Sequence, residues 1–547
     1  QTCALPIWIP YERQYRGKKR KAMNITELQQ SYASHPNVEG VCRLLKDNSV
    51  RHLYCGGLYA SAASLFSSVL VQRATCPLVF ILGDMEEAGY FYHDLTQILG
   101  TEQVLFFPSS FRRAIKYGQK DAANEILRTE VLSRLQKGEE GLCVVTYPDA
   151  LAEKVVSRKE LGENTLKLHA GERVDMNFVT DVLRSYGFEY VDYVYEPGQY
   201  AVRGSIIDVF SFSSEYPFRI DFFGDEVESV RTFEVETQLS KEKKESIVIV
   251  PDLSHSLEKK GSGGMVSFLD FLPSDSLLAM RDFLWLRERI QTVHDESLTP
   301  QAIAARESEE NGAITLEGKL IDGGEFTLRA LDFRRMEFGN KPTGTPDATV
   351  SFHTTVQPIF HKNFDMVAES FREYLSRHYT IYICSDSLKQ TDRIRAIFED
   401  RGDNISFTAV ERTLHEGFAD DTLRICVFTD HQLFDRFHKY NLKSDKARSG
   451  KVALSLKELN QFTPGDYVVH TDHGVGRFAG LVRIPNGDTT QEVMKIVYQN
   501  EDVVFVSIHS LHKVSKYKGK EGEAPRLNKL GTGAWEKLKD RTKTKIK

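Results

Sequence analysis

Apolar and polar positions follow two different rhythms along the chain. In the first 150 residues, short apolar runs are separated by stretches with helical spacing. The runs are Pro77–Leu82, Val104–Phe107 and Leu142–Tyr147. Short buried strands that alternate with helices are typical of a parallel α/β sheet. A second α/β stretch follows Pro342, and its strands are expected at Thr380–Cys384 and Arg424–Thr429.

A period-two pattern begins near His169. Two segments are rich in β-branched and aromatic residues, Tyr200–Phe210 and Pro217–Phe233, and both are expected to form strands. The dipeptide Gly224-Asp225 separates two strand-like runs, which indicates a hairpin.

The two faces of the strand before this hairpin differ in chemistry. Arg219 and Asp221 fall on one face, whereas Ile220 and Phe222 fall on the other. This pattern predicts an antiparallel sheet with one face in water and the other against a core.

A third segment, Thr463–Val514, consists of short strand-like runs with tight turns. Glycines stand at the bends, as in Gly474–Gly480, and Pro485–Asp488 marks a turn. About five strands in some fifty residues, with Gly at the bends, indicate a small curled barrel.

Charge is distributed unevenly along the chain, whose formal net charge is −6. Residues 1–23 hold six Lys or Arg against one Glu, and residues 512–547 hold twelve Lys or Arg against four Asp or Glu. The part between them is therefore strongly acidic. Because non-specific DNA affinity comes mainly from clustered Lys and Arg, we expect the modules of this middle part to bind proteins.

Composition narrows the class of protein further. Apolar residues make up 41% and charged residues 27%, which excludes wholesale disorder. The longest apolar run, Cys76–Leu82, is too short to span a membrane. The seven cysteines include no CxxC pair, so neither a zinc ribbon nor a disulfide framework is indicated and a reducing cytoplasm is expected.

Both ends differ from natural termini. Residues 1–22 show no periodicity and do not form a signal peptide, so we expect a non-native leader before a start at Met23. At the other end, Trp535–Lys547 is expected to be helical and stops without Gly, Asn or Pro. The chain is therefore expected to be a piece of a longer polypeptide.

A Gly-rich turn at Tyr54–Ser64 lies where such a sheet would place a phosphate loop. Against GxxxxGK[ST], Gly57 and Ser64 fit, whereas Ala62 replaces the second Gly and Ala63 replaces the Lys. Without that Lys, no ammonium reaches the β- and γ-phosphates. An ordinary turn and a decayed nucleotide site both predict no ATP hydrolysis, so we predict no catalytic residue.

Two histidine pairs in the third segment raise a zinc hypothesis: His470 with His473, and His509 with His512. No Cys lies nearby, and zinc sites assemble four well-placed ligands. Surface or hydrogen-bonded histidine is the commoner state. We therefore predict no metal site.

Two segments resemble known families. EPGQYAVRGSIIDVF (196–210) and FRIDFFGDEVESVRTF (218–233) are similar to a stretch shared by the excision-repair protein UvrB and the transcription-repair-coupling factors. PGDYVVHTDHGVGRFAGL (464–481) is similar to the CarD-type module by which the latter family contacts RNA polymerase. In this order, with GAWEKLKDRTKTK after them, they resemble the amino-terminal half of a transcription-repair-coupling factor. UvrB has an intact phosphate loop, so the missing Lys favours that family over UvrB.

The resemblance implies an α/β multidomain architecture. A degenerate helicase-like parallel α/β domain would carry an inserted antiparallel β-rich module, followed by a second small α/β domain and a small SH3- or Tudor-like β-barrel. The implied boundaries are 24–147 and 237–342 for the two parts of the UvrB-like domain, 148–236 for the UvrA-binding module, 343–445 for the small α/β domain, 457–520 for the polymerase-interacting barrel and 526–547 for the start of a helical linker.

The resemblance also implies a function in transcription-coupled nucleotide excision repair. The factor would bind stalled RNA polymerase through the β subunit and recruit UvrA. Its ATP-dependent DNA translocase motor, with ATP and magnesium, would lie beyond this chain and make most of the DNA contacts. The chain itself is expected to be a cytoplasmic monomer without a cofactor or a membrane contact. The alternatives are an active UvrB-like or helicase-like ATPase and a CarD-like transcription regulator.

The family's UvrA-contacting positions correspond to Arg203, Arg219 and Phe223. Two arginines beside an aromatic ring are typical of a binding hot spot. The alternative is intramolecular: Arg203 could pair with Asp208 or Asp221, and Phe223 could belong to the core.

For the polymerase β subunit, the corresponding position is Ile484, with Arg477, Val482 and Arg483 as neighbours on a strand edge. An exposed β edge is a template for another strand. Alternatively, Ile484 is a buried hairpin residue, although the following Pro485 favours an edge.

Overall fold

The computed structural model describes residues 22–110, 122–235, 238–252, 265–299, 318–438, 440, 442, 463–486, 489–507, 514–517, 525–530 and 535. The predicted leader (apart from residue 22) and most of the predicted linker lie outside these ranges. The chain divides into two compact units. The first comprises the described residues up to Gly40 with Gly57–Val69 and Phe352–His438, and the second comprises Val41–Gly56, Leu70–Ser351 and the chain from Lys439 onward.

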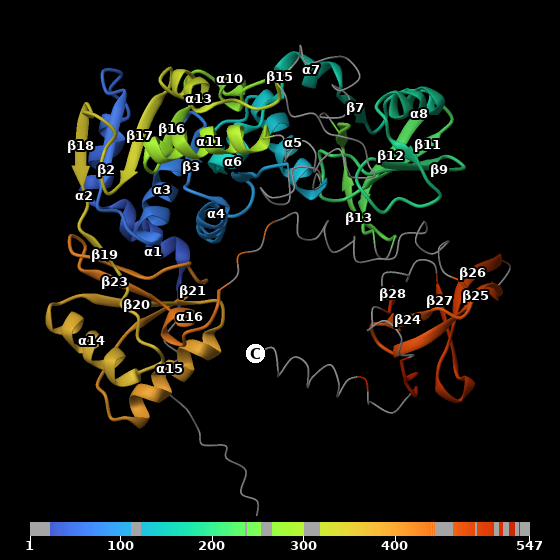
Figure 1. Ribbon diagram of the computed structural model, residues 1–547. Helices are drawn as coiled ribbons and strands as arrows, with labels where there is room; N and C mark the ends of the chain where they lie inside the picture. Colours follow the sequence, from blue (N-terminus) through green and yellow to red (C-terminus); the bar gives the residue numbers. More distant parts are fainter. Residues whose placement is uncertain are drawn as a thin grey trace, which may run out of the picture. The chain divides into compact units, whose positions relative to one another are not determined.

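The first unit contains a six-stranded sheet in the order β1-β21-β20-β23-β22-β19 (Figure 1). Its strands are β1 (Met23–Asn24), β19 (Thr354–Val356), β20 (Thr380–Ser385), β21 (Thr408–Glu411), β22 (Phe418–Asp420) and β23 (Ile425–Thr429). β22 is antiparallel to both of its neighbours, and the other pairs are parallel. The helices of this unit are α1 (Ile25–Ala33), α14 (Phe364–Ser376), α15 (Leu388–Asp400) and α16 (Asp430–Leu433). The two strands predicted after Pro342 are confirmed as β20 and β23.

Seven parallel strands form the main sheet of the second unit, in the order β18-β2-β17-β16-β3-β5-β4. They are β2 (His52–Gly56), β3 (Leu78–Ile81), β4 (Val104–Phe107), β5 (Cys143–Thr146), β16 (Leu277–Met280), β17 (Arg334–Gly339) and β18 (Ala348–Ser351). The three strands predicted in the first 150 residues are confirmed as β3, β4 and β5. A long insertion separates β5 from β16, which lies beside β3.

Helices and short strands complete the surroundings of the two large sheets. The helices are α2 (Pro36–Leu44), α3 (Ser61–Arg73), α4 (Met85–Leu99), α5 (Ala122–Gln136), α6 (Pro148–Ala152), α7 (Arg158–Glu163), α10 (Phe268–Phe271), α11 (Phe283–Ser297) and α13 (Gly323–Ala330). The short strands β6 (Val155–Val156) and β15 (Met265–Val266) pair with each other. None of the described helices has both the length and the apolar character that crossing a bilayer requires.

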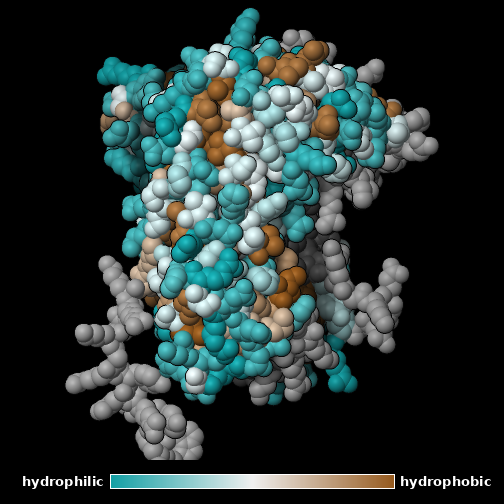
Figure 2. Space-filling model, turned by 90° about the vertical axis from the view of Figure 1, so that its left-hand side faces the viewer, coloured by the Kyte–Doolittle hydropathy of each residue, from teal (hydrophilic) through white to brown (hydrophobic). Residues whose placement is uncertain are grey.

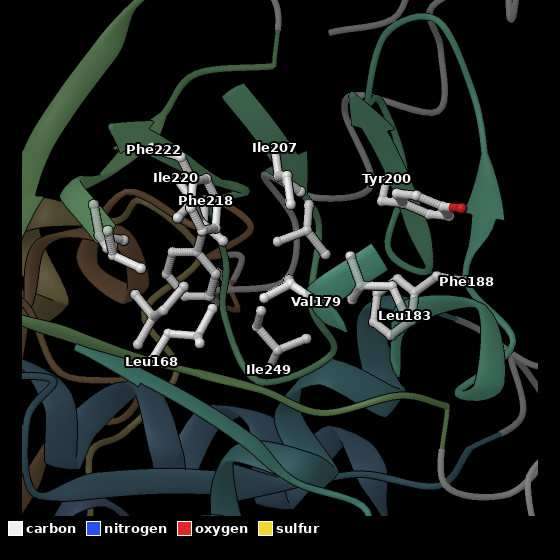
Figure 3. Packing of buried hydrophobic residues seen from close by; sticks show 14 residues of the cluster. Leu168, Val179, Leu183, Phe188, Tyr200, Ile207, Phe218, Ile220, Phe222 and Ile249 are labelled. Carbon is white, nitrogen blue, oxygen red and sulfur yellow. The ribbon is translucent and has the colours of Figure 1, made fainter. Parts of the chain in front are cut away.

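The insertion folds as an antiparallel sheet in the order β13-β12-β11-β10-β9-β8, in which only the short β8 is parallel to its neighbour. Its strands are β8 (Glu189–Tyr190), β9 (Gln199–Arg203), β10 (Ile206–Val209), β11 (Phe218–Phe223), β12 (Glu226–Phe233) and β13 (Ser240–Lys244). β7 (Leu166–His169) pairs with β14 (Ser246–Ile249), and α8 spans Met176–Ser185. Ile207 and Ile220 point from the sheet toward Val179 and Leu183 of α8 in one apolar core (Figure 3). The predicted hairpin at Gly224-Asp225 is confirmed.

The third segment forms a five-stranded antiparallel sheet in the order β27-β26-β25-β24-β28. Its strands are β24 (Tyr467–His470), β25 (Gly474–Asn486), β26 (Thr489–Val497), β27 (Val503–Ser507) and β28 (Val514–Lys516), with a 3-10 turn at Gln499–Glu501. The segment predicted to be a small curled barrel forms this small antiparallel sheet, and no pairing between described residues joins the edge strands β27 and β28 to close it. β24 pairs with β25 only from Gly474 to Arg477, whereas β26 pairs with β25 as far as Asn486.

Apolar side chains on the surface gather in several small patches among hydrophilic residues on the face that Figure 2 shows. Single exposed apolar residues are normal on a folded protein. Surface hydropathy on this face therefore does not distinguish a binding site.

Candidate functional sites

The phosphate-loop position lies between β2 and α3. Gly57 has a φ of 77°, which favours glycine. A Cβ at this residue would come within 2.0 Å of the Phe352 carbonyl oxygen. The turn therefore packs directly against a backbone segment from far along the chain.

Backbone N–H groups at this turn already donate hydrogen bonds to other groups of the protein. The Tyr59 N–H donates to the Thr354 hydroxyl at 3.0 Å, and the Ser61 N–H donates to the Glu416 carbonyl at 3.3 Å. The Glu416 N–H in turn donates to the Ser61 hydroxyl at 3.0 Å. A phosphate is bound by such N–H groups when they are available to it. The position has therefore lost amide donors as well as the Lys.

The residues that replace the phosphate-loop motif are inside the protein. Ala62, Ala63 and Ser64 are all buried in the first turn of α3. An ordinary interior helix start has this character, because small side chains allow close packing.

The outer face of the insertion's sheet, which we define as the face opposite the core in Figure 3, carries the predicted UvrA-contacting residues. Along β11 the side chains alternate between buried and partly exposed, so Arg219 and Asp221 lie on the outer face while Ile220 and Phe222 are buried. The predicted division of chemistry between the two faces is confirmed.

A single carboxylate links the two predicted arginines. Asp208 stands directly opposite Arg219 in the β10–β11 register and has no exposed side-chain surface. Arg219 donates to both of its oxygens, from Nε at 2.7 Å and from Nη2 at 2.9 Å. Arg203 also donates to Asp208 from Nη2. Of the two pairings that the sequence leaves open for Arg203, the one with Asp208 is therefore observed.

The two arginines differ in how much of each side chain is exposed. The Arg219 side chain is only 15% exposed, donates from Nη1 to the Gln238 carbonyl at 3.1 Å, and lies over the Phe233 ring. Its hydrogen bonds to Asp208 raise the pKa of Arg219. Arg203 is 36% exposed and lies over the Tyr193 ring. Arg219 therefore has mainly a positioning role, whereas Arg203 retains surface for a partner.

Phe223 is the most exposed of the three predicted residues. It ends β11 at the hairpin and is 79% exposed, so the alternative that placed it in the core is wrong. An aromatic side chain held in water by a short hairpin is an available anchor for a pocket on another protein.

Sequence reasoning missed a second ion pair on the outer face. Arg231 of β12 donates to Asp221, which also accepts from the Ser229 hydroxyl at 2.7 Å. A β-bulge lies here, because the register shifts between Asp221 and Phe222 and leaves Glu228 as the extra residue of β12. The signal available in the sequence was the alternation of charged residues in both strands of the hairpin.

The predicted polymerase-contacting residues lie on β25. Arg477 is exposed and Val482 is half-buried, whereas the side chains of Arg483 and Ile484 are outside the described residues. From Leu481 to Asn486, β25 pairs with β26 on one side, and no other described strand pairs with it on the other. Within the described sheet, this half of β25 is therefore an edge, and the assignment of Ile484 to a polymerase contact stays a prediction.

The histidine pairs do not assemble a metal site in the described part of the chain. His470 and His473 stack with ring centroids 4.6 Å apart. His509 and His512 lie outside the described residues. Among the residues that are described, no three His, Cys, Asp or Glu side chains converge in a way that could hold a metal ion.

Comparison with known proteins identifies both interaction modules. Residues 166–255 match the family model described as the UvrB interaction domain, and residues 462–518 match the CarD-like/TRCF RID domain. The chain is 22% identical over 568 residues to the transcription-repair-coupling factor of Bacillus subtilis (strain 168). It is 24% identical over 554 residues to that of Staphylococcus aureus (strain bovine RF122 / ET3-1). Both matches cover 90% of this chain and 47% of the relative.

The resemblance to the transcription-repair-coupling factors is confirmed. The chain spans about half the length of the curated relatives it matches. The first family match covers the insertion with its outer face, and the second covers β24 to β28. The residues that the resemblance implies as sites therefore lie within the two segments that match these family models.

We expect the chain to bind no ATP at the phosphate-loop position, even when Ala63→Lys restores the missing residue type. The amide donors are occupied. A lysine buried at this position would have to lose its proton, or its charge would disrupt the start of the helix. Titration with a fluorescent ATP analogue and magnesium measures this, with circular dichroism as a control for folding. Saturable binding by folded Ala63→Lys would show that the turn can still open around a phosphate.

We expect Arg219→Ala to lower the stability of the insertion by about 3 kcal/mol, because it removes the bidentate partner of the buried Asp208 carboxylate. Arg203→Ala should cost about 1 kcal/mol or less, because Arg219 still satisfies Asp208 and Arg203 is partly exposed. Hydrogen exchange of the β10 and β11 amides in the full chain measures both changes. Adding Asp208→Ala to Arg219→Ala should recover part of the loss, and equal costs for the two single variants would contradict the difference in burial.

Proposed function

We propose that the chain is the amino-terminal part of a transcription-coupled DNA repair factor that binds stalled RNA polymerase and recruits UvrA for nucleotide excision repair. The observation that carries the proposal is the presence of a UvrB interaction domain and a CarD-like/TRCF RID domain in one chain. In this proposal, ATP-dependent DNA translocation belongs to a motor outside the chain. That motor would use ATP and magnesium and make most of the DNA contacts.

The alternatives have less support. An active UvrB-like ATPase needs a phosphate cradle, and the amides of Tyr59 and Ser61 are already bonded to other protein groups. A CarD-like transcription regulator would use only residues 462–518, whereas the similarity to the coupling factors covers 90% of the chain. We further propose that the chain acts as a cytoplasmic monomer.

UvrA would contact the outer face through the ring of Phe223 and the guanidinium of Arg203. Phe223 projects into water at the hairpin, where its ring could fill a pocket of the partner. Arg203 keeps about a third of its side chain exposed while Asp208 fixes its direction. A preordered cation loses less conformational entropy on binding than a free one does.

We expect Phe223→Ala to weaken UvrA binding by about 2 kcal/mol or more, with no loss of folding stability. The ring is exposed in the free protein, so its removal costs contacts only in the complex. Titration of purified UvrA onto immobilised chain measures the affinity. Tyr190→Ala is a matched control, because Tyr190 is also an exposed aromatic of this sheet but lies on the edge strand β8. Equal affinities for wild type and Phe223→Ala would remove Phe223 from the site.

RNA polymerase would add a strand to the free edge of β25. Between Leu481 and Asn486 this strand has a described neighbour on one side only, so its outer backbone groups could pair with a strand of the β subunit. Ile484 would supply an apolar contact, and Arg477, Val482 and Arg483 would flank it.

We expect Ile484→Arg to weaken binding of the polymerase β subunit by several kcal/mol, because it would bury an unpaired charge in the interface. A pull-down of β beside one of UvrA measures both contacts, and UvrA capture should be unchanged. Phe505→Arg is the matched control, because Phe505 is half-exposed in β27 of the same sheet. Undiminished capture of β by a folded Ile484→Arg variant would refute the edge assignment.

A further inference from the structure

A glycine lies in the interior of α4, where only proline is less favourable to a helix. Gly89 is the fifth residue of Met85–Leu99 and is buried. A Cβ at this position would lie 2.4 Å from Cζ of Tyr440 and within 2.8 Å of two further atoms of that ring. The missing side chain therefore leaves room for an aromatic ring from far along the chain.

Tyr440 lies just beyond the point where the chain leaves the first unit. That unit ends at His438, and the chain from Lys439 onward belongs to the second unit, as α4 does. The Tyr440 ring meets the Tyr90 ring edge to face, with centroids 4.9 Å apart. Two residues later, Leu442 is also buried. Two side chains of one short segment are therefore held within the second unit.

A simpler interpretation is an incidental contact, in which the chain crosses α4 and Tyr440 does not determine where. The geometry argues against this interpretation. The Tyr440 ring occupies the place that a methyl group on Gly89 would take, so the ring is inserted into the surface of the helix. Its edge-to-face arrangement with Tyr90 adds attraction beyond the area that the two rings bury.

We propose that Gly89 and Tyr90 form an internal docking site for Tyr440, which anchors the connecting segment between the first unit and the sheet of β24 to β28. The connecting segment is defined as residues 439–462, and its anchor is Tyr440 with Leu442. The docking contact does not depend on the proposed function. Its consequence for RNA polymerase does, because that consequence assumes that the sheet of β24 to β28 binds polymerase.

The anchor would restrict how far this sheet can move from α4. With Tyr440 docked, residues 443–462 alone connect the anchor to the segment that forms the sheet. Without docking, the connection would start at His438 and gain residues 439–442, which add up to about 14 Å, since a residue spans at most about 3.5 Å. A shorter connection confines a linked module to a smaller volume and raises its effective concentration near the other binding sites of the chain.

Limited digestion of the full chain with trypsin tests the docking contact. Trypsin cleaves after lysine, and Lys439 and Lys443 stand on either side of the anchor in the sequence. Cleavage requires the backbone to leave the folded surface, so its rate reports how often the anchor is released. Tyr440→Ala should speed cleavage after both lysines by about tenfold, because the ring contact is lost.

Gly89→Ala tests the docking site without changing the connecting segment. Alanine normally stabilises a helix relative to glycine, so α4 should stay folded while the added methyl group displaces the Tyr440 ring. Cleavage should again be about tenfold faster than in wild type. Gly40→Ala is the matched control, because Gly40 lies within α2 and a Cβ there would meet nothing within 4 Å. This control should be cleaved at the wild-type rate.

Small-angle X-ray scattering of the same variants measures the restriction of the sheet. Tyr440→Ala and Gly89→Ala should both increase the maximum dimension of the chain, and Gly40→Ala should not. Circular dichroism confirms that each variant is folded. An unchanged maximum dimension despite faster cleavage would overturn the restriction of the sheet by the anchor.

The cleavage rates decide the docking contact. Wild-type rates in Tyr440→Ala and Gly89→Ala would overturn it, and so would fast cleavage in Tyr440→Ala alone, because the anchor would then not depend on Gly89. Equal acceleration in Gly40→Ala would also overturn it, since this would indicate general loosening. Capture of the polymerase β subunit by wild type is measured separately. If capture fails, the proposed function fails, whereas the cleavage rates still decide the docking contact.

Discussion

The outer face of the inserted sheet is organised around one buried carboxylate. Asp208 has no exposed side-chain surface, and a charge withdrawn from water is costly unless it is paired and hydrogen-bonded. Arg219 bonds both of its oxygens and Arg203 adds a third contact, so this residue determines where two guanidinium groups lie. Arg231 stands opposite Arg219 in the register and is paired with a second carboxylate of the same face, Asp221.

The same rule explains the phosphate-loop position in the other unit. Backbone N–H groups withdrawn from water must find acceptors. Here a threonine hydroxyl and a carbonyl from distant segments supply them at Tyr59 and Ser61. Loss of the Lys and occupation of the amides are consistent with each other, because a loop that no longer binds phosphate can be stabilised by contacts that a nucleotide would have displaced.

The local pattern of residues predicted single strands and the chemistry of their faces, but it did not predict which strands and side chains pair. The strand before the hairpin was correct in position and in the chemistry of each face, because alternation is a property of consecutive residues. The choice between Asp208 and Asp221 as the partner of Arg203 stayed open, since it depends on the register between strands that the sequence does not specify. The predicted barrel is not closed within the described residues, and a count of strands could not show this, because it does not tell how little of β25 is covered by β24. The acceptors that occupy the amides of the phosphate-loop turn come from Thr354 and Glu416, which no local motif indicates.

Shared use of Asp208 means that the two arginines cannot contribute independently to stability and binding. A change at Arg219 leaves a buried charge with one partner, so reduced binding by such a variant would combine a disturbed sheet with a lost contact. Phe223 and Lys243 neutralise no buried charge in the described structure, because both are exposed at the margins of the sheet. The energetics of recognition are therefore best separated from those of folding at the hairpin and the edge strand, while the arginines between them report on how well the face is held together.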